Sequence, residues 1–265
     1  MVVELKARVV AVANQKGGVG KTTTAISLGA TLAAYERQTL LVDLDPQSNC
    51  SSGLGFRGDG GQPTSYDLVL GGATVETAAQ PSEFPHLTVV PATPDLAGAE
   101  VELVGMVGRE FRLRDALAGN ATDPYDFVFV DCPPSLGLLT LNALAAADGL
   151  LVPIQCEYFA MEGVSMLMST VDEVRRFLNP GLTIDGILLT MYDERTNLAQ
   201  QVADEVRGVF GDLVFETLVP RNVRLAEAPS FGRPIHAYDL RSRGSQAYLE
   251  LGREYLTRRE NAHVR

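Results

Sequence analysis

The chain has 265 residues, 46% of them hydrophobic and 21% charged, a composition typical of a globular protein with a sizeable buried core. Its 22 basic residues against 33 acidic ones give a net charge of −11, which argues against wholesale nucleic-acid binding. It has no apolar run long enough to cross a bilayer and no signal-peptide pattern. Three widely spaced cysteines, Cys50, Cys132 and Cys156, argue against a disulfide framework or a zinc site, so we expect a cytoplasmic protein with reduced thiols.

Buried strands and helices alternate almost throughout the chain. In order, the sequence predicts a strand over 8–14 (RVVAVAN), a helix over 21–35, strands over 39–45 (TLLVDLD) and 87–92, a helix over 97–118, a strand over 127–131 (FVFVD), a helix over 137–147, a strand over 149–154, a helix over 161–178, a strand over 184–191, a helix over 197–210, a strand over 213–220 and a helix over 244–259. The last helix places Tyr248, Leu251 and Tyr255 on one face.

Continuous apolar strands separated by helices are typical of a parallel sheet. We therefore predict an α/β fold, doubly wound, with a mostly parallel sheet and helices on both faces. A single domain over 1–265 is the simplest account, with a core of about 8–256 and a short flexible tail at 257–265. Ligands of such sheets bind beyond the carboxyl ends of the strands. The loop 14–24 follows the first predicted strand, Asp43 and Asp45 lie at the end of the second, and Asp131 comes after FVFV, so we expect them to meet there.

The loop NQKGGVGKTTT, residues 14–24, contains most of a phosphate-loop pattern. The glycines Gly17, Gly18 and Gly20 let backbone N–H groups turn towards a phosphate chain at the start of the next helix. Lys21 is placed to reach the β- and γ-phosphates, and the Thr22 hydroxyl to bind Mg²⁺. Further predicted contacts come from Val19, from Thr23 near the α-phosphate, and from Asp131, which would orient Mg²⁺ through water.

Two residues of this loop depart from the ordinary pattern. Gln15 stands where the motif opens with glycine, and a second lysine, Lys16, follows it. The chain has 19 arginines but only three lysines, and two of the lysines lie in this loop. A compact ammonium fits among backbone N–H groups around a phosphate where a guanidinium is too bulky. The lysine usage therefore supports a nucleotide site with two lysines.

KGGVGKTT, together with LLVDLDPQ and FVFVDCPPS, closely resembles the deviant Walker A ATPases, and NQKGGVGKTTT is similar to their ParA/Soj branch, in which Gln15 is the usual residue. The resemblance extends over roughly 8–256. It implies an Mg²⁺-dependent ATPase with a weak intrinsic rate and an ATP-bound homodimer, in which Lys16 reaches the nucleotide of the other subunit. It further implies that Asp45 positions the attacking water, and that Pro220, Asn222 and Glu227 hold adenine and ribose. An alternative for Asn222, left open, is that it caps the short helix that follows.

The same resemblance implies non-specific binding of double-stranded DNA through Arg195 and Arg224. Further candidates for this contact, which the resemblance does not itself mark, are Arg221, Arg233, Arg241 and Arg243. Residues 195–265 carry 11 basic and 9 acidic side chains, so the local charge allows such a patch. A ParB-type centromere-binding partner is expected to stimulate hydrolysis and release the DNA, which places the protein at the nucleoid and off the membrane. Chromosome and plasmid cargo remain alternatives.

Three other functions were weighed. A membrane-bound division-site regulator would need a basic amphipathic C-terminal helix, and the tail TRRENAHVR has no apolar face after Leu256. A switch ATPase of the same superfamily could instead act on a protein or iron–sulfur client, and an iron–sulfur carrier would use Cys132 and Cys156 as candidate ligands. A small-molecule ligase or amidase would need a substrate pocket that the sequence does not reveal, and His86, His236 and His263 have no evident catalytic partner.

Overall fold

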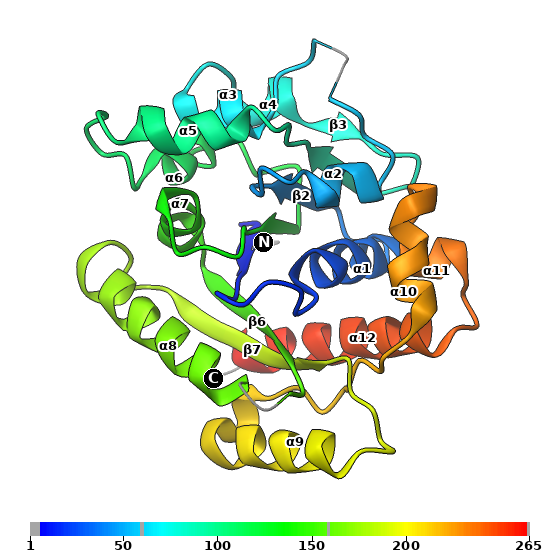
Figure 1. Ribbon diagram of the computed structural model, residues 1–265. Coiled ribbons are helices and arrows are strands. Elements are labelled where there is room, and N and C mark those ends of the chain that lie inside the picture. The colour runs from blue at the N-terminus through cyan, green and yellow to red at the C-terminus, as the bar shows by residue number, and fades with distance from the viewer. Residues whose placement is uncertain (1–5, 59–60, 158–159, 264–265) are drawn as a thin grey trace.

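A seven-stranded sheet forms the centre of the computed structural model, which describes residues 6–58, 61–157 and 160–263 (Figure 1). The strand order is β3-β4-β2-β5-β1-β6-β7, and every neighbouring pair is parallel except β3 with β4. The strands are β1 (Arg8–Val12), β2 (Thr39–Asp43), β3 (Gln80–Pro81), β4 (Leu87–Val90), β5 (Phe127–Asp131), β6 (Gly149–Gln155) and β7 (Thr183–Thr190).

Helices lie against both faces of this sheet (Figure 1). They are α1 (Lys21–Ala34), α2 (Asn49–Gly53), α3 (Ser65–Leu70), α4 (Val75–Ala78), α5 (Leu96–Leu103), α6 (Arg112–Ala116), α7 (Leu138–Ala146), α8 (Ala160–Phe177), α9 (Asn197–Phe210), α10 (Val223–Glu227), α11 (Ile235–Tyr238) and α12 (Arg243–His263), with 3₁₀ turns η1 (Gly211–Leu213) and η2 (Ala228–Phe231). Within the described residues, no helix combines the length and apolarity that a membrane span requires.

The two faces of the sheet carry separate hydrophobic cores because successive strand side chains point to opposite sides. In β1, Val9 and Ala11 pack into the core formed with α3 and α5–α9, whereas Val10 and Val12 pack into the core formed with α1 and α12. The predicted fold class, a mostly parallel sheet with helices on both faces, is confirmed. Tyr248, Leu251 and Tyr255 are buried together on α12, as their spacing predicted.

The strand predicted over 213–220 is wrong. Only isolated bridges join this segment to the sheet edge, Ile187 with Val214 and Tyr192 with Pro220. Between the bridges, the backbone N–H groups of Glu216 and Thr217 donate to the carboxylate of Glu254 on α12, at 2.8 and 2.9 Å. These bonds draw the chain away from β7, so a regular ladder does not form.

The single helix predicted over 97–118 is also wrong, since the structure has two short helices there. α5 ends at Leu103 and α6 begins at Arg112. Gly105 and Gly108 lie between them, and Gly108 has φ 67°, a left-handed conformation that a helix cannot include. The antiparallel strand β3 was not predicted, because two residues that include Pro81 give no periodicity.

The parallel register collects the acidic residues of the predicted site at one edge of the sheet. Asp43, the last residue of β2, pairs with Asp131, the last residue of β5, and Asp131 pairs in turn with Val12 of β1. The loop after β1 therefore begins beside two carboxylates from neighbouring strands.

Candidate nucleotide-binding site

The loop between β1 and α1 has a glycine-dependent shape. Gly18 and Gly20 have φ 74° and 89°, values that L side chains rarely adopt. Gly20 precedes α1 directly, and its carbonyl accepts the first helical bond from the N–H of Thr24 at 2.9 Å. The unpaired N–H groups of the first turn of α1 therefore face the loop, as an anion site requires.

A side chain just after β1 and another at the end of β7 hold this loop in place. The buried amide of Asn14 donates to the Pro153 carbonyl at 2.7 Å and accepts from the Lys16 N–H at 3.0 Å. The hydroxyl of Thr190 donates to the carbonyl of the buried Val19 at 2.8 Å. The loop is thus fixed at both ends by the described residues themselves.

The two lysines of the loop have different surroundings. Lys21 is 6% exposed, and its ammonium donates to the Lys16 carbonyl at 3.0 Å. Burial lowers the pKa of Lys21, and the charge of Asp131 opposes this shift. The ammonium of Lys16 instead pairs with Glu157, just beyond β6, at 3.2 Å, and both side chains are partly exposed. Gln15 is half-buried beside them.

Asp43 is a buried carboxylate with several donors. It accepts from the N–H of Ser51 at 2.8 Å, from the Ser51 hydroxyl at 2.6 Å and from the N–H of Asp45 at 3.1 Å. Burial nevertheless raises its pKa to about 6. Asp43 therefore ties the end of β2 to α2, which favours a structural role for it.

Asp131 differs from Asp43 because neither of its carboxylate oxygens has a hydrogen-bond partner within the described residues, although it is only 1% exposed. Burial, followed by the charge of Asp43, raises the pKa of Asp131 well above its ordinary range, and the nearby Thr22 hydroxyl, followed by the charge of Lys21, opposes the shift. An unpaired buried carboxylate is costly unless a ligand satisfies it.

These groups fit a magnesium ion that arrives with its nucleotide. In the described part of the chain, no cluster of three or more His, Cys, Asp or Glu side chains could hold a metal alone. Mg²⁺ commonly keeps several waters and takes few protein ligands in addition to substrate phosphates. Asp131 and the Thr22 hydroxyl are of the right chemistry for such a site.

The loop residues line a pocket of about 300 Å³. Its lining includes Gly17, Gly18, Gly20, Lys21, Thr22, Thr23, Asp45, Gln47, Asn49, Pro134 and Met191. Asp45 is 6% exposed and its carboxylate accepts from the N–H of Gln47 at 2.9 Å, which orients it at the pocket wall. Lys16 does not line this pocket.

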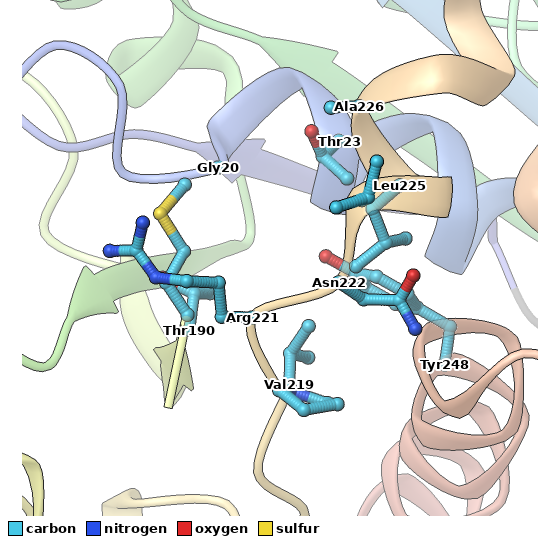
Figure 2. A pocket seen from close by; sticks show the side chains of 12 residues that line it. Gly20, Thr23, Thr190, Val219, Arg221, Asn222, Leu225, Ala226 and Tyr248 are labelled. Carbon is cyan, nitrogen blue, oxygen red and sulfur yellow. The ribbon is translucent and has the colours of Figure 1, made fainter. Parts of the chain in front are cut away.

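A second pocket of about 340 Å³ continues from the first, since Gly20, Thr23 and Met191 line both. Its other lining residues are Thr190, Val219, Pro220, Arg221, Asn222, Val223, Leu225, Ala226 and Tyr248. Figure 2 shows the Arg221 side chain near Gly20 and the Tyr248 side chain entering from α12 on the opposite side. The mostly apolar lining suits a flat base, with the phosphate pocket alongside.

Of the three predicted base contacts, Pro220 and Asn222 line this pocket and Glu227 does not. The Asn222 amide oxygen accepts from the N–H of Arg224 at 2.8 Å, so the alternative interpretation, a helix cap, is present. Its NH₂ group is left as a donor. Glu227 accepts from Arg224 at 2.8 Å and from the Tyr238 hydroxyl at 3.1 Å.

Sequence reasoning missed Tyr248 as a member of the pocket. We expected it on the buried face of the last helix, and its hydroxyl indeed pairs with the buried Thr24 of α1 at 3.0 Å. Its contribution to the base pocket depends on how α12 docks against α1, which no local pattern reports. Met191, which directly follows β7 and has φ 50°, was also missed.

The predicted DNA-binding arginines are exposed and paired with carboxylates. Arg195 makes two bonds to Asp193, at 2.8 and 2.7 Å, with 83% of its side chain exposed. These bonds lower the pKa of Asp193 to about 2. Arg195, Arg221 and Arg243 line one surface pocket of about 190 Å³. Arg224 lies further along the chain and pairs with Glu227 and Asp239.

The three cysteines are free and buried, as their spacing predicted. Burial raises the pKa of Cys156 to about 11 and that of Cys132 further still. A metal or cluster ligand must be a thiolate, and these surroundings disfavour it. Of the histidines, His86 contacts Gln38 and the half-buried His236 has an unpaired Nδ1, and neither lines the two pockets.

A glycine loop at the carboxyl edge of a parallel sheet, with a lysine, a threonine and an unpaired aspartate around a phosphate-sized pocket, defines a P-loop nucleotide-binding protein.

A family model described as an AAA domain matches residues 7–184. The sequence is 59% identical to the chromosome partitioning protein ParA of Myxococcus xanthus, over 95% of this chain and 88% of that one. It is 54% identical to the chromosome-partitioning ATPase Soj of Thermus thermophilus, over 97% and 98%. The chain belongs to the ParA/Soj family of chromosome-partitioning ATPases.

A solved structure carries similar geometry. Cobyrinic acid a,c-diamide synthase from Mycobacterium smegmatis, with bound ADP and magnesium, superposes with a TM-score of 0.80. It is 40% identical in sequence, over 93% of both chains. That protein holds a nucleotide and magnesium on this fold, which agrees with the two continuous pockets described above.

Proposed function

We propose that this ATPase is a nucleotide-controlled DNA clamp: ATP closes two subunits into a dimer, the dimer binds double-stranded DNA without sequence preference, and hydrolysis releases it. The observation that carries the proposal is the pair of lysines in one loop. Lys21 lines the proposed phosphate pocket, whereas Lys16 does not line it and pairs with Glu157. A lysine outside its own pocket is available to a nucleotide held by a second subunit.

The phosphate pocket supplies positioning and charge neutralisation, which phosphoryl transfer chiefly needs. Residues from Gln15 to Thr23 form the loop around the phosphates, and Lys21 replaces its bond to the Lys16 carbonyl with bonds to phosphate oxygens. Asp45, at the pocket wall, is our candidate for orienting the attacking water. Thr22 and Asp131 would hold Mg²⁺, which supplies charge neutralisation at the phosphates when bound.

Lys16 is the proposed contact between subunits. An ATP molecule enclosed between two chains brings concentrated negative charge into a dry interface, and a lysine from the second chain neutralises it. Loss of the γ-phosphate removes that charge, so the dimer loosens. Pro220 and Asn222, with Glu227 nearby, remain the proposed base and ribose contacts.

The DNA contact is proposed at Arg195 and Arg224, with Arg221 and Arg243 nearby. In the monomer these arginines are paired with acidic neighbours, and the whole chain has a net charge of −11. Non-specific affinity grows with the number of phosphates neutralised, so a monomer should bind weakly. A dimer presents twice as many arginines. We further propose a ParB-type partner that stimulates hydrolysis, and association with the nucleoid in the cytoplasm.

The alternative, a switch ATPase with a protein or iron–sulfur client, gains no specific support from the described residues, because Cys132 and Cys156 are buried as thiols. An amide-forming activity like that named for the M. smegmatis protein rests on lower identity than the partitioning activity does, 40% against 54–59%.

Gel retardation of double-stranded DNA tests the proposal. Wild type, Arg195→Ala and a matched control, Arg114→Ala on the distant α6, are each mixed with DNA without nucleotide, with ADP and with ATP–Mg²⁺, at two salt concentrations. We expect a salt-sensitive shift with ATP–Mg²⁺ alone, lost in Arg195→Ala and kept in Arg114→Ala. DNA binding of equal strength without nucleotide, or none under any condition, would contradict the clamp.

A further inference from the structure

In the single chain, the ammonium of Lys16 forms an ion pair with the carboxylate of Glu157. The Glu157 carboxylate oxygen Oε2 lies 3.2 Å from the Lys16 Nζ. The other oxygen, Oε1, accepts from the Gln155 side chain and lies 3.8 Å from the Arg221 guanidinium. The Glu157 carboxylate thus lies between the ammonium of Lys16 and the guanidinium of Arg221.

The position of Glu157 follows from the sheet topology. β6 lies between β1, which leads into the phosphate loop, and β7, which leads to Met191 and Tyr192. Just beyond β6, the Glu157 N–H donates to the Gln155 carbonyl at 2.8 Å, a tight turn at the strand end. The Tyr192 carbonyl accepts from the Arg221 N–H at 3.1 Å, so the Arg221 backbone is fixed beside the same edge.

The backbone of Lys16 is also fixed, which leaves only its side chain to change partners. Its N–H donates to the Asn14 side chain, a bond that does not involve Lys21 and so can persist when Lys21 leaves the Lys16 carbonyl for a phosphate. A transfer of the ammonium from Glu157 to a phosphate therefore needs rotation of a flexible lysine stem and no movement of the loop. The pair is partly exposed, at 36% for Lys16 and 46% for Glu157, so water can enter as it breaks.

We propose that Glu157 is a positioning residue that retains Lys16 within its own subunit until the phosphates of a nucleotide in a second subunit compete for it. This inference rests on the proposed dimer. A partly exposed ion pair is weak, so Glu157 sets the ATP concentration at which dimers form and does not prevent their formation. Loss of the carboxylate should lower that concentration.

The experiment titrates dimer formation with a non-hydrolysable ATP analogue and Mg²⁺, followed by sedimentation velocity. The variants are wild type, Glu157→Gln, Lys16→Ala and Glu83→Gln. The last makes the same charge change at an exposed site by β3, at the opposite end of the strand order, and serves as the matched control. Thermal unfolding of each variant verifies that it is folded.

We expect Glu157→Gln to form dimers at an analogue concentration about two- to five-fold lower than wild type, as removal of a weak ion pair allows. Because the restraint is electrostatic, the difference should shrink as salt rises towards 1 M. Glu83→Gln should match wild type. An unchanged midpoint would overturn the inference, and so would a higher one, which would make Glu157 a group that the closed dimer needs.

The two proposals fail in different ways. If wild type does not dimerise with the analogue, or if Lys16→Ala dimerises as readily as wild type, the proposed trans contact is wrong. If wild type dimerises, Lys16→Ala does not, and Glu157→Gln behaves as wild type at every salt concentration, only the role of Glu157 is wrong.

Discussion

The ammonium of Lys21 donates a hydrogen bond to the backbone carbonyl of Lys16 at 3.0 Å. This bond gives a partner to the ammonium of a lysine that is 6% exposed. It also links the two lysines of the loop, since Lys21 must leave the carbonyl to reach a phosphate. Their side chains nevertheless serve different subunits in the proposed dimer, so their removal should have different consequences.

Lys21→Ala should weaken ATP binding by about 10- to 100-fold, since it removes charge-assisted hydrogen bonds to phosphate. Lys16→Ala should bind ATP within a few-fold of wild type but fail to dimerise. Titration with a fluorescent nucleotide measures the first property, and sedimentation velocity the second. Equal loss of nucleotide affinity in both variants would show that Lys16 acts within its own subunit.

Asp131→Asn should stabilise the nucleotide-free protein at pH 7 by about 1–3 kcal/mol, because it removes a buried charge whose oxygens are unpaired. The folded-state pKa of Asp131 lies above its unfolded value. Its protonated form therefore contributes stability below about pH 4, and that stability is lost as the pH rises through the folded-state pKa. The difference in free energy of unfolding between Asp131→Asn and wild type should therefore shrink on acidification.

With ATP and Mg²⁺, wild type should become the more stable of the two proteins, since its Asp131 carboxylate gains a ligand and the amide of Asp131→Asn does not. Thermal unfolding at pH 5 and pH 7, with and without ATP–Mg²⁺, checks both halves of this prediction. A variant that is less stable than wild type under every condition would assign Asp131 a purely structural role.

Asn222 can be tested for its two roles separately. Aspartate is as good a helix cap as asparagine but lacks the NH₂ donor. If the NH₂ group contacts the base, Asn222→Asp should keep its thermal stability and lose about tenfold in ATP affinity. Asn222→Ala should lose about 1 kcal/mol of stability as well. Calorimetric titration with ATP decides, and unchanged affinity in Asn222→Asp would leave the residue as a cap alone.

Asp193→Asn should strengthen DNA binding by the ATP-bound protein, because Asp193 is the carboxylate that Arg195 must leave to meet a phosphate. We expect the dissociation constant to fall about two- to five-fold at low salt, with a smaller difference at high salt. Asp123→Asn, the same change at an exposed site before β5, is the control. Weaker DNA binding in Asp193→Asn would mean that the aspartate holds Arg195 in its binding geometry.

The sequence was sufficient for the parts of the fold that depend on local pattern. The six strands predicted from 8–14 to 184–191 are present with shifted ends, because apolar runs such as FVFVD are buried on both sides. It failed at 213–220, where Val214, Phe215 and Val219 are buried but Glu254, far along the chain, accepts from two N–H groups of the segment. Burial and strand pairing are separate requirements, and only burial has a local signature.

The candidate site divides in the same way. The phosphate loop, Asp45 and Asp131 could be predicted because each follows a strand and carries a recognisable motif. Glu157 could not, since it lies 141 residues from Lys16 and meets it only through the adjacency of β1 and β6. The roles of all site residues, and the single domain over 1–265, stay predictions.

The hydroxyl pair of Thr24 and Tyr248 spans nearly the whole chain. The phosphate loop ends near residue 24, yet the wall of its base pocket comes from 219–226 and from α12. During synthesis, the ribosome would therefore release a complete glycine loop long before anything could enclose an adenine beside it. The nascent chain should remain unable to retain ATP until α12 has folded against α1, so the proposed dimers should not form on unfinished chains.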